Sequence, residues 1–268
     1  MNSPVRLACL LAFVASASLP AQTLFSDSLA SDASNWIVNP SNTGGGALTF
    51  ASARLNYLVA SPTGSDAGYR QLNTYSAPST SSWSAQVDLH LASFSGLIAE
   101  QSVNLNLFVG KATDAANNRV TFALDRYNAG SGVVRDFDTY VKTGGTETHL
   151  TEITNATTDA TLRITFSHLA NTLTLAYDDD GVATNGATFL TAHTVDVSGW
   201  NMGGGNFAFL LIGASGNDTG TGPTIGAGDA YFQNFAVTAV PEPSSYALFA
   251  GGVALLLSGL RRRFLANR

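Results

Sequence analysis

The segment YDDDGVATNG brings three carboxylates together: Asp178, Asp179 and Asp180. Carboxylate oxygens are hard ligands that suit Ca²⁺. The alternating Asp-x-Asp-x-Asp-Gly spacing of an EF-hand loop is missing, and aspartates before a glycine are also typical of a solvated hairpin turn. The sequence therefore predicts a solvated turn and no cofactor, with calcium bound by Asp178, Asp179 and Asp180 as the alternative. Asp218 and Asp229 could complete a site only if the fold brings them close.

Hydrolysis of a glycan would need two carboxylates on either side of the glycosidic bond. The segment 22–239 has three glutamates, Glu100, Glu147 and Glu152, and the arrangement Glu-x-Asp-x-x-Glu along one strand is absent. Glu147 and Glu152 are five residues apart, so on a regular strand they point to opposite faces. The histidines have no metal-binding spacing, and the Gly-x-Ser-x-Gly motif is missing. The sequence therefore predicts that the protein is not an enzyme.

Three tryptophans offer a different chemistry, because the flat face of an aromatic ring covers apolar sugar surface. Trp83 alternates with apolar residues and is expected in the core. Trp36 and Trp200 stand among asparagines or glycines and are candidates for a sugar-stacking platform. The threonines keep no fixed repeat, so a regular ice-binding array is not predicted.

The segment 22–239 is acidic and lacks cysteine. It contains 18 acidic and 8 basic residues, a formal charge near −10, and the chain's one cysteine, Cys9, precedes it. Because no basic stripe is present to neutralise phosphates, we expect no nucleic-acid partner. Without disulfides, the domain must depend on its hydrophobic core.

Apolar and polar residues alternate with period two along most of this segment, which predicts half-buried antiparallel strands. The alternating runs are WSAQVDLHL (83–91), SVNLNLFV (102–109), RVTFALDRY (119–127), TLRITF (161–166) and TLTLAY (172–177). NFAFLLIGA (206–214) is apolar on both faces, as expected for a central strand. The sequence predicts an all-β sandwich or barrel.

The N-terminal residues 1–21 have the layout of a secretory signal peptide: Arg6, an apolar run, then small residues. Cleavage after Ala21 is favoured and cleavage after Ala17 is the alternative.

The C-terminal residues combine the motif VPEPS at 240–244, an uncharged segment at 245–260 and a basic tail at 261–268. A helix over the uncharged run Tyr246–Leu260 would extend roughly 22 Å, short of a bilayer core of about 30 Å, but terminal arginines can snorkel to the interface. We expect a transmembrane helix at 245–260 with its basic tail in the cytoplasm.

This order of features resembles the PEP-CTERM sorting signal of Gram-negative bacteria, a segment also known as an "ice-binding protein C-terminal" domain. The resemblance covers 240–268 and implies export, transient anchoring in the inner membrane and recognition by an exosortase. Products of the family are often associated with exopolysaccharide and biofilm matrix. By this resemblance the sorting motif is Pro241, Glu242 and Pro243, and the membrane stop is Arg261, Arg262 and Arg263.

The strand order of 22–239 resembles a concanavalin A-like (laminin G-like) jelly roll, with a galactose-binding-like jelly roll as the alternative. The run LFSDSLASDASNWIV resembles the first strand of such domains, and DAYFQNFAVT resembles the last strand that pairs with it. Three functions follow as hypotheses. The first is a cell-surface or matrix protein associated with exopolysaccharide, the second a calcium-dependent lectin and the third a polysaccharide hydrolase.

Overall fold

The computed structural model describes residues 21–31, 34–150, 152–180, 188–218 and 220–241. Contacts group Gln22–Val240 as one compact unit, and the terminal segments Met1–Ala21 and Pro241–Arg268 as another. The predicted signal peptide, except Ala21, and the predicted transmembrane helix at 245–260 lie outside the described residues. Within the described ranges, no helix has the length and apolarity needed to span a bilayer.

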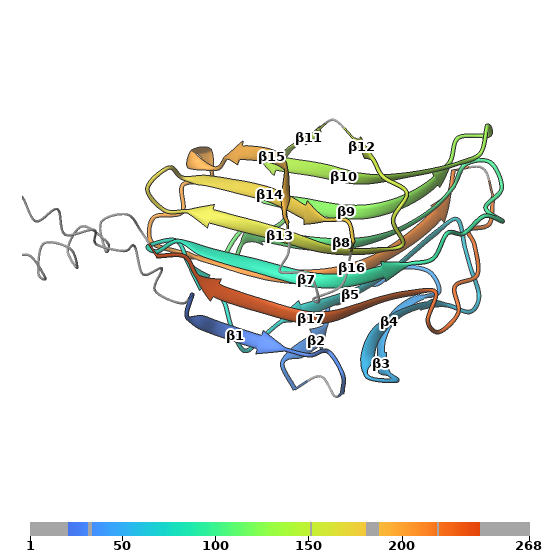
Figure 1. Cartoon of the computed structure of the whole chain (residues 1–268), viewed down its shortest axis with the longest axis horizontal. Coiled ribbons are helices and arrows are strands. Elements are labelled where there is room, and N and C mark those ends of the chain that lie inside the picture. The colour runs from blue at the N-terminus through green and yellow to red at the C-terminus, as the bar shows by residue number, and fades with distance from the viewer. Residues whose placement is uncertain (1–20, 32–33, 151, 181–187, 219, 242–268) are drawn as a thin grey trace, which may run out of the picture. The chain divides into compact units, whose positions relative to one another are not determined.

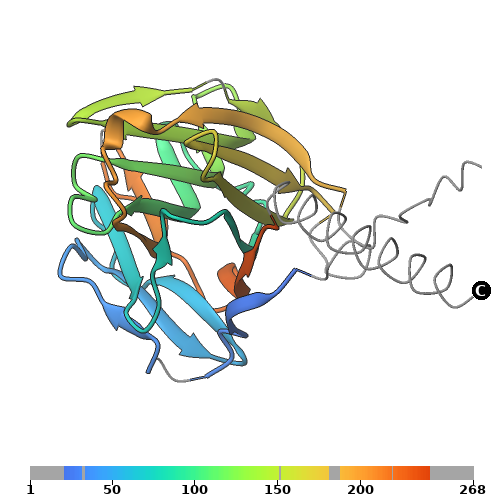
Figure 2. The same cartoon turned by 90° about the vertical axis from the view of Figure 1, so that its left-hand side faces the viewer.

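Two antiparallel sheets, named A and B here, form the unit Gln22–Val240 (Figures 1 and 2). Sheet A has eight strands in the spatial order β15–β14–β13–β7–β17–β4–β3, with β1 beside β17. Its strands are β1 (Thr23–Asp27), β3 (Gly46–Ala51), β4 (Arg54–Val59), β7 (Trp83–Leu91), β13 (Asp159–Ser167), β14 (Thr172–Asp178), β15 (Leu190–Asp196) and β17 (Ala230–Ala239).

Sheet B has nine strands in the order β11–β10–β9–β8–β16–β5–β2, with β12 beside β10 and β6 beside β16. Its strands are β2 (Trp36–Val38), β5 (Ser65–Leu72), β6 (Ala77–Pro78), β8 (Gln101–Lys111), β9 (Arg119–Asn128), β10 (Val133–Thr143), β11 (Thr146–His149), β12 (Ile153–Thr154) and β16 (Asn206–Asn217). One 3₁₀ turn, η1 (Ser198–Trp200), is the single helical element among the residues that the structure describes.

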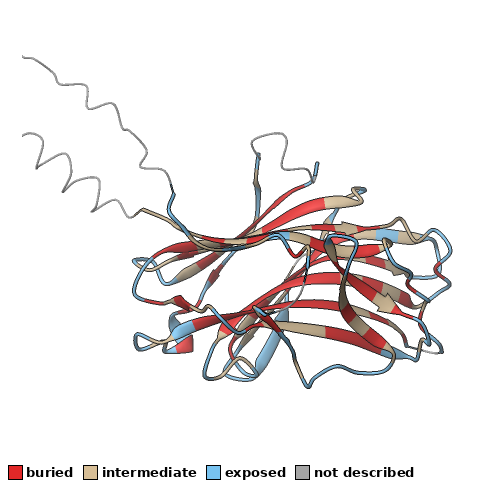
Figure 3. Cartoon of the chain, turned by 90° about the horizontal axis from the view of Figure 1, so that it is seen from below, coloured by how far each residue is buried: buried red, intermediate tan, exposed pale blue. Residues whose placement is uncertain are grey.

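The alternation in the sequence decides which side chains enter the core. In β7, every second residue from Trp83 to Leu91 is buried, and the residues between them are half-buried. The inner faces of the two sheets pack against each other, so the buried residues of both layers form one hydrophobic cluster (Figure 3). The predicted all-β antiparallel sandwich is confirmed.

The predicted pairing of the first strand with the last is confirmed, and two of the predicted strands form a hairpin. β13 and β14 form a hairpin in which Phe166 lies opposite Leu173, and Asn171 turns the chain with a φ of 52°. The first strand, β1, pairs with the last strand, β17. β16, which is apolar on both faces, lies inside sheet B between β8 and β5.

Candidate functional site on the outer face of sheet B

Alternate residues of β8 and β16 point away from the core of the sandwich. In β8, Leu105 and Leu107 belong to the core cluster, so Asn106 and Phe108 lie on the outer face. Asn106 pairs with Ile212 of β16 and Phe108 with Leu210, which places all four side chains on the same outer face.

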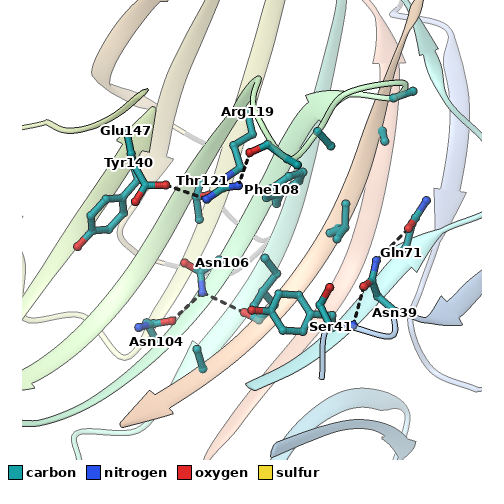
Figure 4. Close-up of a pocket in the computed structure, with 18 residues that line it drawn as sticks. Asn39, Ser41, Gln71, Asn104, Asn106, Phe108, Arg119, Thr121, Tyr140 and Glu147 are labelled. Carbon is teal, nitrogen blue, oxygen red and sulfur yellow. Dashed lines mark hydrogen bonds and ion pairs between the residues drawn. The ribbon is translucent and has the colours of Figure 1, made fainter. Parts of the chain in front are cut away.

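The outer face of sheet B has a hollow of about 600 Å³, shown in Figure 4. This volume is within the range of small-ligand sites, about 300–1,000 Å³. Phe108, Leu210 and Ile212 form its apolar floor and are only 7–8% exposed, although the other sheet does not cover them. Tyr69 of β5 and Ala115 of the β8–β9 turn pack beside this floor. The sandwich therefore holds a second, smaller apolar cluster outside its core.

Amide side chains line the hollow beside this floor (Figure 4). The Nδ2 of Asn106 donates to the Oδ1 of Asn104 at 2.7 Å and to the carbonyl of Ile212 at 3.1 Å. The Nδ2 of Asn39 donates to the Oε1 of Gln71 at 3.1 Å. Among described residues, this leaves the Oδ1 of Asn106 and the Nε2 of Gln71 without a hydrogen bond and open to a ligand.

Among the described residues, one positively charged side chain, Arg119, and one negatively charged side chain, Glu147, line the hollow. The guanidinium of Arg119 donates from Nη2 to the Oε2 of Glu147 at 2.8 Å and from Nη1 to the carbonyl of Ala116 at 3.1 Å. Tyr140 of β10 lies on the same side of the hollow (Figure 4). The Arg119–Glu147 pair is partly exposed and leaves the lining with no net charge.

An acidic cluster lies beside the hollow on the same face. The β9–β10 register places Asp125 directly opposite Asp136, and Asp138 follows two residues later. Burial, followed by the charges of Asp136 and Asp138, raises the pKa of Asp125 to about 7. Burial, followed by the charges of Glu152 and Asp138, raises the pKa of Asp136 to about 6. These carboxyls therefore hold protons at a higher pH than ordinary aspartates do.

Three members of this face converge closely enough to hold a metal ion. One ligand atom each from Asp138, His149 and Glu152 lie within 4.8 Å of one another. The Nε2 of His149 contacts the Oδ1 of Asp138 and lies 3.7 Å from the Oε1 of Glu152. Asp136 is 5% exposed, and its carboxylate forms no hydrogen bond within the described part of the chain. Carboxylates with an imidazole suit Mn²⁺ or Zn²⁺ better than Ca²⁺, which prefers oxygen ligands alone.

The prediction that Glu147 and Glu152 point to opposite faces of a strand does not apply. β11 ends at His149, so Glu152 does not belong to the strand that carries Glu147. Glu147 and His149 both belong to β11 and pair with Lys142 and Tyr140 of β10. The Oε1 of Glu152 lies 3.7 Å from the Nε2 of His149. The premise of a regular strand was wrong because the strand is shorter than the interval between the glutamates.

The predicted calcium ligands lie at the end of β14, in sheet A. Asp179 accepts a hydrogen bond from the Nδ2 of Asn155 at 3.0 Å, and the backbone N of Asp180 donates to the Oδ1 of Asp178 at 3.3 Å. Asp229 accepts from the backbone N of Gly226 in its own loop. Calcium binding at Asp178–Asp180 stays a prediction.

The tryptophans do not form a sugar-stacking platform, because the structure places Trp36, Trp83 and Trp200 in the core at 0–1% exposure. Trp36 packs edge-on against Phe235, and Trp200 lies beside Phe207. The prediction for Trp83 is confirmed. The apolar residues of the hollow were not predicted from the sequence, although the apolar outer positions of β16 were a signal for them.

The two antiparallel sheets have a fold similar to that of legume lectins, a concanavalin-like jelly roll. Lectin II from Ulex europaeus is 10% identical, with 82% of this chain and 100% of that chain covered and a TM-score of 0.50. A lectin from Bauhinia forficata in complex with GalNAc is 11% identical, with 81% and 98% covered and a TM-score of 0.50.

The GH43 BlXynB protein from Bacillus licheniformis has a similar fold over part of its length. It is 13% identical with a TM-score of 0.50, and the alignment covers 80% of this chain and 39% of that chain. At these identities the likeness shows the fold alone. No curated protein matches the chain by sequence.

The C-terminal segment carries a PEP-CTERM protein-sorting motif, which matches residues 239–263. The match begins one residue before the predicted start at 240 and includes the predicted motif and membrane stop. Such a motif implies an exported protein that an exosortase sorts. All of the match beyond Pro241 lies outside the described residues.

Proposed function

We propose that the domain Gln22–Val240 is a non-enzymatic, glycan-binding protein of the cell surface or extracellular matrix, associated with exopolysaccharide or biofilm. The hollow on the outer face of sheet B carries this proposal. Sugar recognition needs an apolar surface for the ring and polar groups for the hydroxyls. The floor of Phe108, Leu210 and Ile212 supplies the first, and the free amide atoms of Asn106 and Gln71 supply the second.

The carboxylates of this face support binding over hydrolysis. Among the residues that the structure describes, Glu147 is the one carboxylate that lines the hollow, and it is paired with Arg119. A glycosidase needs two carboxyl groups across the bond that it cleaves. The acidic cluster lies beside the hollow and includes no lining residue. We therefore expect no release of reducing ends when the domain is incubated with polysaccharide from its host.

Affinity electrophoresis in gels that contain the host exopolysaccharide tests the proposal. Tyr69→Ala removes a side chain that lines the hollow and should weaken binding about tenfold or more, since aromatic contacts of this kind contribute on the order of 1.4 kcal/mol. Tyr231→Ala is the matched control, because Tyr231 lies on the outer face of sheet A. Equal loss of binding in both variants, or no retardation of the unmodified domain, would contradict the proposal.

A second candidate is glycan binding that depends on a divalent cation. The convergence of Asp138, His149 and Glu152 beside the hollow favours it, together with the buried carboxylate of Asp136. The cluster would hold the ion, and the ion would neutralise carboxylates that otherwise repel one another.

Thermal unfolding with Mn²⁺, Zn²⁺, Ca²⁺ or chelator tests this candidate. Mn²⁺ or Zn²⁺ should raise the melting temperature, and His149→Ala should abolish the rise, because binding to the native state alone stabilises it. Asp178→Asn tests the calcium site predicted from sequence. If Ca²⁺ raises the melting temperature and only Asp178→Asn removes this rise, the cation binds at the β14 loop and not at Asp138, His149 and Glu152.

A further inference from the structure

We propose that the hollow on sheet B selects neutral glycans that carry methyl groups, either as 6-deoxyhexoses or as acetylated sugars. This inference rests on the proposed glycan-binding function and names its ligand class. Two properties of the hollow carry it: a floor without polar groups and a lining without net charge.

The three side chains of the floor offer no hydrogen-bond partner of their own to a sugar hydroxyl. Phe108, Leu210 and Ile212 have no side-chain donor or acceptor, and Ala208 and Ala214 extend the same apolar surface along β16. β16 pairs on both sides, with β8 and with β5, so its backbone groups are engaged in the two ladders. A hydroxyl pressed against this floor would lose its water without a replacement, whereas a methyl group would gain from burial.

The lining disfavours acidic glycans. Arg119 is paired with Glu147 at 2.8 Å, so its guanidinium is already neutralised. Lys142 lies opposite Arg119 in the β9–β10 ladder but does not line the hollow. The acidic cluster of Asp125, Asp136 and Asp138 on the same face would repel a uronate. The neighbouring charges therefore favour a glycan that has none.

The free amide atoms fix the orientation of the sugar. The Oδ1 of Asn106 can accept from a ring hydroxyl and the Nε2 of Gln71 can donate to one, and both lie beside the floor, because Asn106 pairs with Ile212 and Gln71 with Leu210. Ring hydroxyls then meet the amides, and the methyl substituent points toward Leu210 and Ile212. A sugar without a methyl group would present a hydroxyl to the same floor.

Calorimetric titration with four oligosaccharide classes tests the inference on the whole domain. The classes are 6-deoxyhexose oligomers, N-acetylglucosamine oligomers, hydroxyl-only glucose or mannose oligomers, and uronate oligomers. One of the two methyl-bearing classes should bind at least about tenfold more tightly than the hydroxyl-only class, and uronates should bind most weakly. The stronger of the first two identifies which methyl-bearing sugar the hollow accepts.

Ile212→Thr shortens the side chain by one carbon, places a hydroxyl on the floor and should reduce the preference for methyl-bearing sugars several-fold. Ile98→Thr is the control, because Ile98 is 62% exposed and does not line the hollow. If Ile212→Thr does not fold, Ala214→Ser adds a hydroxyl to the same surface with little added volume.

The outcomes separate this inference from the proposed function. Equal affinity for methyl-bearing and hydroxyl-only oligomers would overturn the inference and leave glycan binding intact. Preference for uronates would overturn the argument from charge. Failure of all four classes and of the host exopolysaccharide to bind would overturn the proposed function itself.

Discussion

Asp125 and Asp136 face each other across the β9–β10 ladder, where like charges destabilise a sheet. Burial raises the pKa of both carboxyls, to about 7 and about 6. A folded-state pKa above the ordinary value of 3.8 means that the native state binds protons more tightly than the unfolded state. Stability therefore falls as the pH rises from about 4 to about 7. Such opposed carboxylates are a cost to the fold that a bound cation would offset.

Asp125→Asn is expected to stabilise the protein in the presence of chelator. The amide has the shape of the carboxyl but no charge, so the gain should be about 2 kcal/mol at about pH 8 and close to zero at about pH 4. Urea unfolding at both pH values measures it. Asp196→Asn is a control that should destabilise the protein at about pH 8. Hydrogen bonds from Ser198 lower the pKa of Asp196, so its ionised form contributes to stability. If Asp125→Asn raised the free energy of unfolding equally at both pH values, the charge of Asp125 would not be the cause of the destabilisation.

A buried tyrosine of sheet A forms hydrogen bonds with strands of sheet B. Tyr57 of β4 reaches from sheet A to sheet B, where its hydroxyl donates to the carbonyl of Asp66 at 2.8 Å and lies 3.0 Å from the Oγ of Ser215. The ring packs on Gly213 of β16, where a Cβ atom would lie 2.3 Å from the Cγ of Tyr57. The glycine is therefore needed for β4 and β16 to approach each other.

Gly213→Ala is expected to destabilise the sandwich by about 3 kcal/mol, because the added methyl group must displace the Tyr57 ring or the strand. Gly96→Ala is the matched control, since its added methyl group meets nothing within 4 Å. Equilibrium unfolding in urea compares the two. If Gly213→Ala lowers the free energy of unfolding no more than Gly96→Ala does, β16 can shift without a loss of stability.

The whole molecule combines an acidic, cysteine-free domain with a sorting motif at 239–263. Prolines fix their own backbone angle and restrict the residue before them, so Pro241 and Pro243 favour an extended segment. An extended segment is the form in which a protease binds its substrate. We infer that the tail is removed at the membrane, which leaves the sandwich outside the cytoplasm.

Replacement of Pro241, Glu242 and Pro243 by alanines is expected to leave an uncut, membrane-bound protein. Replacement of Arg261, Arg262 and Arg263 by serines should weaken membrane retention instead. Mass spectrometry of the protein recovered from its native host determines the C-terminal residue. Released protein that still ends at Arg268 would contradict removal of the tail.

The sequence by itself determined the strands, the all-β class and the sorting motif, because these depend on local patterns. Period-two alternation assigns each residue of β7 to a face, and the order of Pro-Glu-Pro, apolar run and arginines needs no tertiary contact. Only the tertiary structure decided the site. Asp125 and Asp136 are brought together by the β9–β10 register. Phe108 and Leu210, which lie far apart in the chain, meet through pairing of β8 with β16. Strand register and sheet order are set by the packing of the whole core, so no local pattern reveals which outward-facing residues become neighbours.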